Sequence, residues 1–90
     1  MSKNKEFEEN ESFDDLKYLL GNMGIEILFA IGNGAKNFKT IKLFSGVPLS
    51  CIKGRVPVLL ELALIEKNNN DYILTEKGLK FIKKLANKAF

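Results

Sequence analysis

The sequence predicts a single, mainly helical α+β domain in which two short helices are followed by a β-hairpin and a last helix. Two apolar-periodic segments, residues 38–45 and 49–63, are separated by a turn at Gly46. The polar residues 68–71 then separate two short β-capable runs, residues 64–67 and 72–75. A further periodic segment begins after Thr75, a residue type that caps helices. Together these signals predict a helix-turn-helix with a two-stranded wing.

The length and composition favour one globular domain. Ninety residues, 46% of them hydrophobic and 28% charged, lie near the size at which a single chain is only marginally stable, so self-association would help. We expect a polar tail over residues 1–11 and one domain over residues 12–90. No apolar run approaches the roughly 20 residues that span a bilayer, and the polar N-terminus lacks the core of a signal peptide. We therefore expect a cytoplasmic protein without a membrane partner.

Few residues in the chain could carry catalysis. There is no histidine, and Cys51 is the single cysteine, so an internal disulfide or a metal cluster cannot form. The Gly32-Asn33-Gly34 sequence lacks the preceding strand and the following Gly-Lys-Ser/Thr of a phosphate loop. We expect neither an enzyme nor a cofactor. Cys51 itself could be a redox sensor, a link between two subunits or a passive small residue.

Charge is segregated along the chain. Residues 1–34 carry three lysines against seven acids, a net charge of −4. Residues 35–90 carry ten lysines and one arginine against four acids, a net charge of +7. Such an imbalance is typical of nucleic-acid binding. For the last helix, a solvated lysine face explains the pattern equally well.

Two helices should precede the helix-turn-helix. Ser12 and Asp15 form an acidic variant of the capping box, which predicts a first helix over residues 12–20 that ends at Gly21. A second helix, residues 23–31, is apolar on so much of its surface that it should be the central helix of the core.

In the helix-turn-helix, Asn37 should cap the helix of residues 38–45 and Gly46 should end it. The core side of this helix should consist of Phe38, Ile41 and Phe44. In the second helix, the core side should consist of Leu49, Ile52, Val56, Leu59 and Ala63, and the outward side of Ser50, Cys51, Lys53, Gly54, Arg55 and Val58.

Pro57 lies within the second helix and conflicts with a regular recognition helix. It removes the hydrogen bond to Lys53 and clashes with that carbonyl, at a cost of about 3 kcal/mol in an unkinked helix. Either the helix bends, or it begins near Val56 and residues 50–55 form a loop. The contacts that residues 50–55 could make with DNA bases would differ between the two cases.

The order of these features resembles a known family. A helix-turn-helix followed by Leu-Ile-Glu-Lys, a polar wing and the phrase Tyr-x-Leu-Thr-Glu-Lys-Gly is similar to the small winged helix-turn-helix transcription regulators of archaea and bacteria. The resemblance covers residues 24–85. It implies a winged helix-turn-helix fold, double-stranded DNA as the partner, and a second helix that reads the DNA while the first one positions it.

The candidate DNA-binding residues follow from this arrangement. Lysine and threonine at the start of the first helix suit phosphate, Arg55 suits a two-pronged contact to guanine, and the wing asparagines suit phosphates or the minor groove. The alternatives are solvent-exposed charges on the helix and plain turn formation in the wing. The predicted residues are Lys36, Lys39, Thr40, Ser50, Lys53, Gly54, Arg55, Lys67, Asn68, Asn69 and Asn70.

The last helix, residues 76–89, has an apolar surface too wide for one small domain, which favours a twofold interface. In the family that the chain resembles, an added N-terminal helix often joins the C-terminal helix in such an interface. The alternative is that both helices cover their own subunit. The predicted interface residues are Phe13, Leu16, Leu20, Phe81, Leu85, Ala89 and Phe90.

We therefore predict a homodimeric, sequence-specific regulator that binds double-stranded DNA. Two alternatives remain open: a weakly specific architectural DNA-binding protein, favoured by the lysine excess and by Pro57, and a winged-helix adaptor that binds another protein. The target sequence, the sign of regulation and any small-molecule effector are not determined by the sequence.

Overall fold

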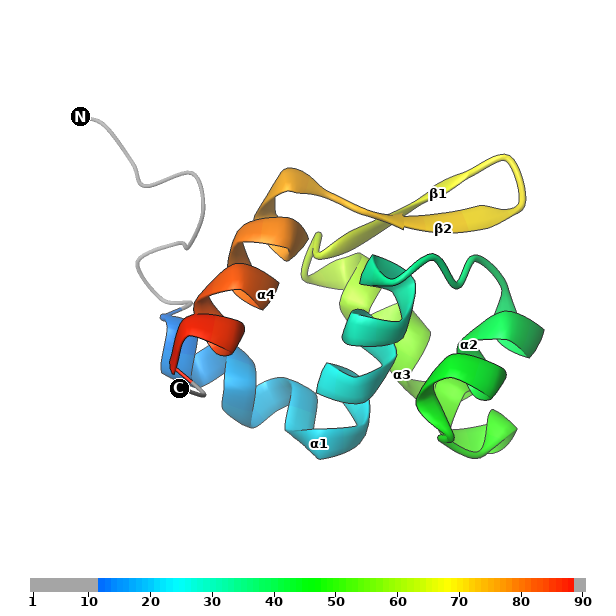
Figure 1. Ribbon diagram of the computed structural model, residues 1–90, viewed down its shortest axis with the longest axis horizontal. Helices are drawn as coiled ribbons and strands as arrows, with labels where there is room; N and C mark the ends of the chain where they lie inside the picture. Colours follow the sequence, from blue (N-terminus) through cyan, green and yellow to red (C-terminus); the bar gives the residue numbers. More distant parts are fainter. Residues whose placement is uncertain (1–11, 89–90) are drawn as a thin grey trace.

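The computed structural model describes residues 12–88, and the predicted tail together with Ala89 and Phe90 lies outside this range. The elements follow the order α1 (Phe13–Gly32), α2 (Phe38–Ser45), α3 (Leu49–Glu61), β1 (Ile65–Asn68), β2 (Asp71–Leu74) and α4 (Glu76–Lys88) (Figure 1). Within residues 12–88 the chain is thus mainly helical with a small two-stranded antiparallel sheet, which confirms the predicted α+β class.

Helix α1 is bent at Gly21, where the backbone has φ 68° and ψ 179°. Glycine accommodates this positive φ without strain. The two predicted N-terminal helices therefore exist and meet at this residue. Ser12 caps the first of them, because its side chain accepts a hydrogen bond of 3.1 Å from the Asp15 N–H. The bend lets α1 pack against α2, α3, α4 and β2 (Figure 1).

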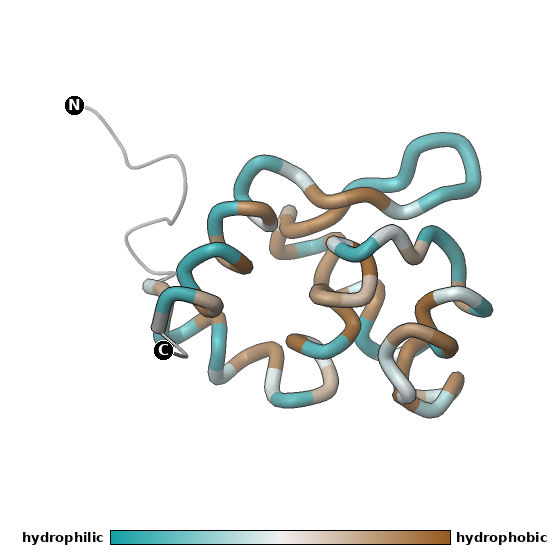
Figure 2. The backbone as a smooth tube through the Cα atoms, in the orientation of Figure 1, coloured by the Kyte–Doolittle hydropathy of each residue, from teal (hydrophilic) through white to brown (hydrophobic). Residues whose placement is uncertain are grey.

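The core lies between the bent helix and the elements around it. Figure 2 shows hydrophobic residues on the inward sides of several helices. Ile27 and Leu28 of α1 and Ile41 of α2 are fully buried. From α3, Ile52, Val56 and Leu59 join them, as the periodicity predicted. These contacts hold the helix-turn-helix pair on the central helix.

Three residues predicted for the core side are exposed, and a fourth, Phe38, is half-buried. Phe44 is 54% exposed and Leu49 is 39% exposed, whereas Ala63 lies beyond the end of α3 with a φ of 62° and is exposed. Val47, in the turn, is buried although the periodicity did not include it. Apolar spacing alone did not reveal that the turn residue itself points inward.

Helix α4 is rotated relative to the prediction. Phe81 is fully buried and its ring centroid lies 5.3 Å from that of Phe13, whereas Leu79 is 44% exposed. The predicted dimer interface is therefore wrong at four positions, because these side chains lie in the core of a single chain: Phe13, Leu16, Leu20 and Phe81. Leu85 is half-buried.

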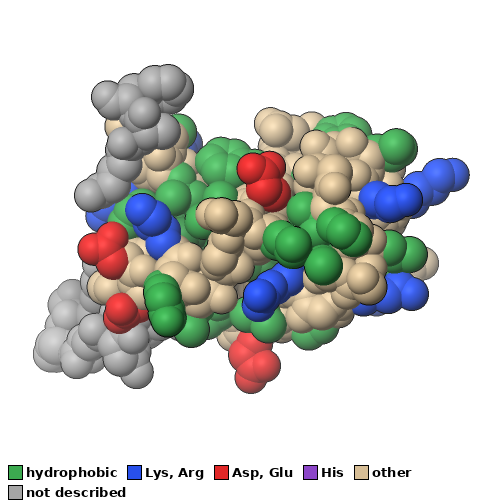
Figure 3. Space-filling model, turned by 90° about the horizontal axis from the view of Figure 1, so that it is seen from below, with side chains coloured by type: hydrophobic (Ala, Val, Ile, Leu, Met, Phe, Trp, Pro, Cys, Tyr) green, Lys and Arg blue, Asp and Glu red, His purple; other side chains and the backbone are tan. Residues whose placement is uncertain are grey.

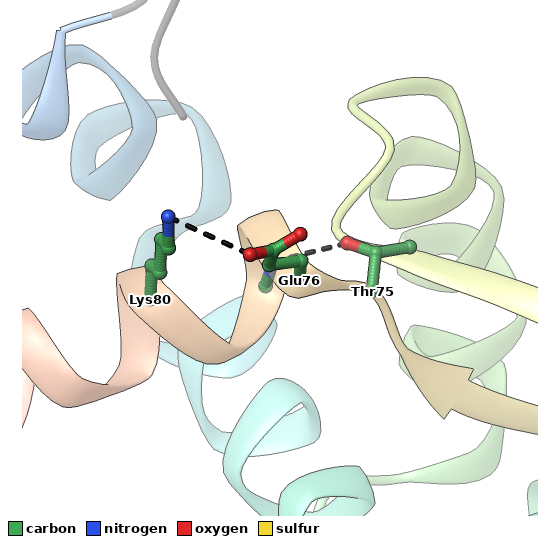
Figure 4. A network of polar contacts seen from close by, with 4 residues as sticks. Thr75, Glu76 and Lys80 are labelled. Atoms are coloured by element: carbon green, nitrogen blue, oxygen red, sulfur yellow. Dashed lines mark hydrogen bonds and ion pairs between the residues drawn. The ribbon is translucent and has the colours of Figure 1, made fainter. Parts of the chain in front are cut away.

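Close contacts fix the start of α4 against the end of α3. The Thr75 hydroxyl accepts a hydrogen bond of 3.0 Å from the Gly78 N–H and donates one of 2.6 Å to the Ala63 carbonyl. Lys77 donates from Nζ to the Leu62 carbonyl at 2.8 Å. Figure 4 shows the Thr75 contact beside the ion pair of 3.7 Å between Lys80 Nζ and Glu76 Oε2. The Thr-Glu-Lys-Gly phrase thus joins α4 to the α3–β1 connection.

The hairpin pairs Ile65 with Leu74 and Asn68 with Asp71, so its turn consists of Asn69 and Asn70. Both strands lie within one residue of their predicted positions. The Tyr72 N–H donates to the Lys36 carbonyl at 2.8 Å, which ties the hairpin to the segment before α2.

No single helix among residues 12–88 is long and apolar enough to cross a membrane. Only α2 and α3 taken together reach that length and apolarity, and their axes bend by 108° at the turn.

Candidate nucleic-acid interface

Helices α2 and α3 form a compact pair around a three-residue turn. The angle of 108° between them lies in the range of about 90–120° that is usual for helix-turn-helix units. Gly46 ends α2 in the left-handed conformation, with φ 74°, and its N–H donates to the Lys42 carbonyl. The predicted bounds of α2 and its cap at Asn37 are confirmed. Local signals therefore set the geometry of the turn.

The start of α2 presents lysines and holds its polar side chains in a capping box. Lys36 and Lys39 are exposed, as a phosphate contact requires. The Thr40 hydroxyl instead accepts hydrogen bonds from the N–H groups of Lys36 (2.9 Å) and Asn37 (3.0 Å). In return, the Asn37 side chain accepts from the Thr40 N–H at 2.9 Å. Thr40, predicted as a phosphate contact, thus has a structural role at the helix start.

The outward side of α3 carries the residues predicted to read DNA. Ser50, Lys53, Gly54 and Arg55 are all exposed. Cys51 and Val58, also predicted to face outward, are half-buried. Among residues 12–88, no hydrogen bond or ion pair engages the side chains of Ser50, Lys53 or Arg55. These groups are available to an external partner.

Pro57 lies inside α3, which begins at Leu49 directly after Pro48. Of the two alternatives, the one in which the helix begins near Val56 is therefore wrong, and residues 50–55 are helical. Burial of Ile52 favours this outcome, because a buried aliphatic side chain contributes about 1.5–3 kcal/mol, which is comparable to the cost of about 3 kcal/mol for the proline.

The charged residues of α2, and those of α3 as far as Leu60, are all cations, whereas Glu61 at the end of α3 is an exposed carboxylate. From Ile27 to Leu60 the sequence contains five cations and no carboxylate. Lys42, one of the five, is exposed on α2 but was missed by the sequence analysis, although it lies one turn after Lys39. Figure 3 shows Lys and Arg side chains at the end of the molecule that α2 occupies in Figure 1. A surface rich in cations attracts polyanions.

The hairpin extends to the same end of the molecule as α2 (Figure 1). Lys67 is exposed, and its Nζ lies 5.7 Å from the centroid of the Tyr72 ring, which in turn stacks on Phe38 at 5.9 Å. The asparagines 68–70 are exposed, and Asn69 has a φ of 61°, as a tight hairpin turn requires. Turn formation thus explains Asn69 without any ligand.

The described residues offer little else as a site. A groove of about 260 Å³ lies between the end of α1 and β2, is mainly apolar, and has Lys36 as its charged lining residue. Among residues 12–88, no three His, Cys, Asp or Glu side chains lie together where they could hold a metal ion. The α2–α3 surface is the strongest candidate site.

Comparison of the sequence with models of known protein families gave no match, and none of the curated proteins is significantly similar to it.

Proposed function

We propose that the chain is a transcription regulator of the winged helix-turn-helix type that binds double-stranded DNA. The observation that carries the proposal is the exposed outer side of α3. This side lies within residues 27–60, a stretch of the sequence that contains cations and no carboxylate. The angle of 108° between α2 and α3 is usual for helix-turn-helix units. Because such a regulator acts on chromosomal DNA, the proposal also places the chain in the cytoplasm.

Each exposed cation of α2, α3, the wing and the segment before α2 has a role in this proposal. Helix α3 enters the major groove, where the guanidinium of Arg55 contacts O6 and N7 of a guanine with two hydrogen bonds. Lys53 contacts a guanine acceptor or a phosphate. Lys36, Lys39 and Lys42 bind phosphates, which adds affinity without sequence information. Lys67 brings a further cation from the wing.

A selection from random-sequence duplexes, followed by fluorescence anisotropy titrations at several salt concentrations, tests the proposal. Arg55→Ala should weaken binding to the selected duplex by about 1–3 kcal/mol and relax the preference at one base pair. Lys39→Ala should weaken binding to all sequences alike and reduce the salt slope by about one.

Lys83→Ala is the matched control, because Lys83 is exposed on α4 and has no place in the proposed interface. It should leave the preference unchanged. Absence of binding to any duplex at low salt would contradict the proposal.

A weakly specific architectural role is the second candidate. Pro57 and Gly54 favour it, because both lie within α3 and weaken a regular recognition helix. In that case the selection would yield no preferred sequence, and affinity would fall steeply with salt while differing little between duplexes.

Self-association remains part of the proposal, but on side chains other than those first predicted. Tyr18 and Leu19 of α1 and Leu79 of α4 are 88%, 50% and 44% exposed. Sedimentation equilibrium should show a dimer that Leu19→Ser together with Tyr18→Ser weakens, whereas Leu43→Ser on α2 leaves it intact. If the protein were monomeric at all concentrations, the proposed self-association would be wrong, whereas the proposed DNA interface would be unaffected.

A further inference from the structure

An apolar side chain stands at the first residue of the proposed reading helix. Leu49 opens α3 and is 39% exposed, although its spacing predicted burial. Val47, two residues earlier, is buried at 6% exposure, whereas Leu49 keeps part of its side chain accessible.

Leu49 lies at the edge between the buried side of α3, where Ile52 is three residues away, and the exposed side, where Lys53 is four residues away. Residues four apart on a helix are neighbours on one face, so Leu49 lies one turn from Lys53. Helical side chains also lean toward the N-terminus of their helix, and the first residues of a recognition helix are those that contact base edges. Leu49 therefore meets a base pair next to the one that Lys53 reaches.

The major groove offers one apolar group to such a side chain. Thymine presents its C5-methyl group, whereas the other three bases present hydrogen-bonding groups there without a methyl. Contact between two apolar groups removes both from water and is favourable in proportion to the buried area.

We propose that Leu49 contacts the C5-methyl of a thymine and makes the chain prefer duplexes with thymine at that position. This inference rests on the proposed function and specifies its substrate class. Loss of one methyl contact of this kind should weaken binding about fourfold, the value expected for one buried methyl-sized group.

Deoxyuridine provides the test, because it lacks the methyl of thymine and keeps its O4 and its pairing. In the duplex obtained from the selection, each thymine is replaced in turn, and affinity is measured by anisotropy for the wild-type chain and for Leu49→Ala. One replacement should weaken wild-type binding about fourfold and should have no effect on Leu49→Ala.

Leu43→Ala is the control, because Leu43 is 72% exposed but lies on α2. It should retain the full deoxyuridine effect. Circular dichroism melting should show that both variants fold, since each truncates a side chain outside the core.

The inference is overturned if no replacement changes wild-type affinity, or if Leu49→Ala shows the same loss as the wild type. Either result would leave DNA binding itself intact. Failure to bind any duplex would instead defeat the proposed function and, with it, this inference.

Discussion

Two regions of the molecule use similar residues in opposite ways. At the junction between α3 and α4, Thr75 and Lys77 direct their polar atoms at the carbonyls of Ala63 and Leu62. On the outer side of α3, Lys53 and Arg55 are exposed, and within residues 12–88 neither side chain has a hydrogen-bonding or ionic partner. At the junction, the polar side chains form hydrogen bonds within the chain. On the α3 surface, the donors of Lys53 and Arg55 can bind an external partner.

The comparison shows that a familiar sequence phrase and a functional site need not coincide. The Thr-Glu-Lys-Gly phrase carried much of the resemblance, yet three of its four residues hold α4 in place. Lysines are likewise not equivalent, because Lys77 is half-buried and bonded to a backbone carbonyl. Only exposed lysines contribute to a surface for DNA.

The largest effect that separates the two regions should come from their glycines. A Cβ at Gly78 would collide with the backbone carbonyl of Leu64, so Gly78→Ala should destabilise the fold by about 3 kcal/mol or more. A Cβ at Gly54 would have no neighbour within 4 Å, so Gly54→Ala should stabilise α3 by about 0.5–1 kcal/mol. Urea denaturation of both variants measures the difference.

Equal stability changes at the two glycines would show that the junction is not closely packed. Gly54 is also exposed on the proposed interface. The DNA affinity of the Gly54→Ala variant therefore shows, separately from its stability, whether the interface tolerates an added methyl group.

A smaller effect should come from the hydroxyl that caps α4. Thr75→Ala removes both the acceptor for the Gly78 N–H and the donor to the Ala63 carbonyl, which should cost about 2 kcal/mol. Thr75→Ser keeps the hydroxyl and is the matched control, with a loss below about 1 kcal/mol. Thermal or urea unfolding provides the measurement, and similar losses in the two variants would assign the effect to the methyl group.

Helix ends were predictable because their signals are local. Asn37 and Gly46 bound α2 as expected, and Gly21 interrupts α1 where the sequence placed a stop. Caps and left-handed glycines act within three or four residues, so no distant contact is needed to read them. The exposed cations of the candidate site were predictable for the same reason, since Lys53 and Arg55 follow from the periodicity of α3.

The rotation of α4 was not predictable, because its apolar residues cover more of the helix than one small core can bury. Spacing favoured Leu79, whereas the structure buries Phe81 and places Gly78 against the Leu64 carbonyl. The element that packs against α4 decides which side of the helix faces the core. Here the absence of a side chain at Gly78 lets the backbone of α4 approach the Leu64 carbonyl closely.

The sequence by itself determined where α2 and the hairpin begin and end, and which half of the chain is cationic, because caps, turns and charges are properties of neighbouring residues. Only the tertiary structure decided that Val47 rather than Leu49 is fully buried, that α3 continues through Pro57, and that four of the predicted dimer residues lie inside one chain: Phe13, Leu16, Leu20 and Phe81. Those outcomes depend on packing between segments far apart in the sequence, where buried side chains can offset a single local preference.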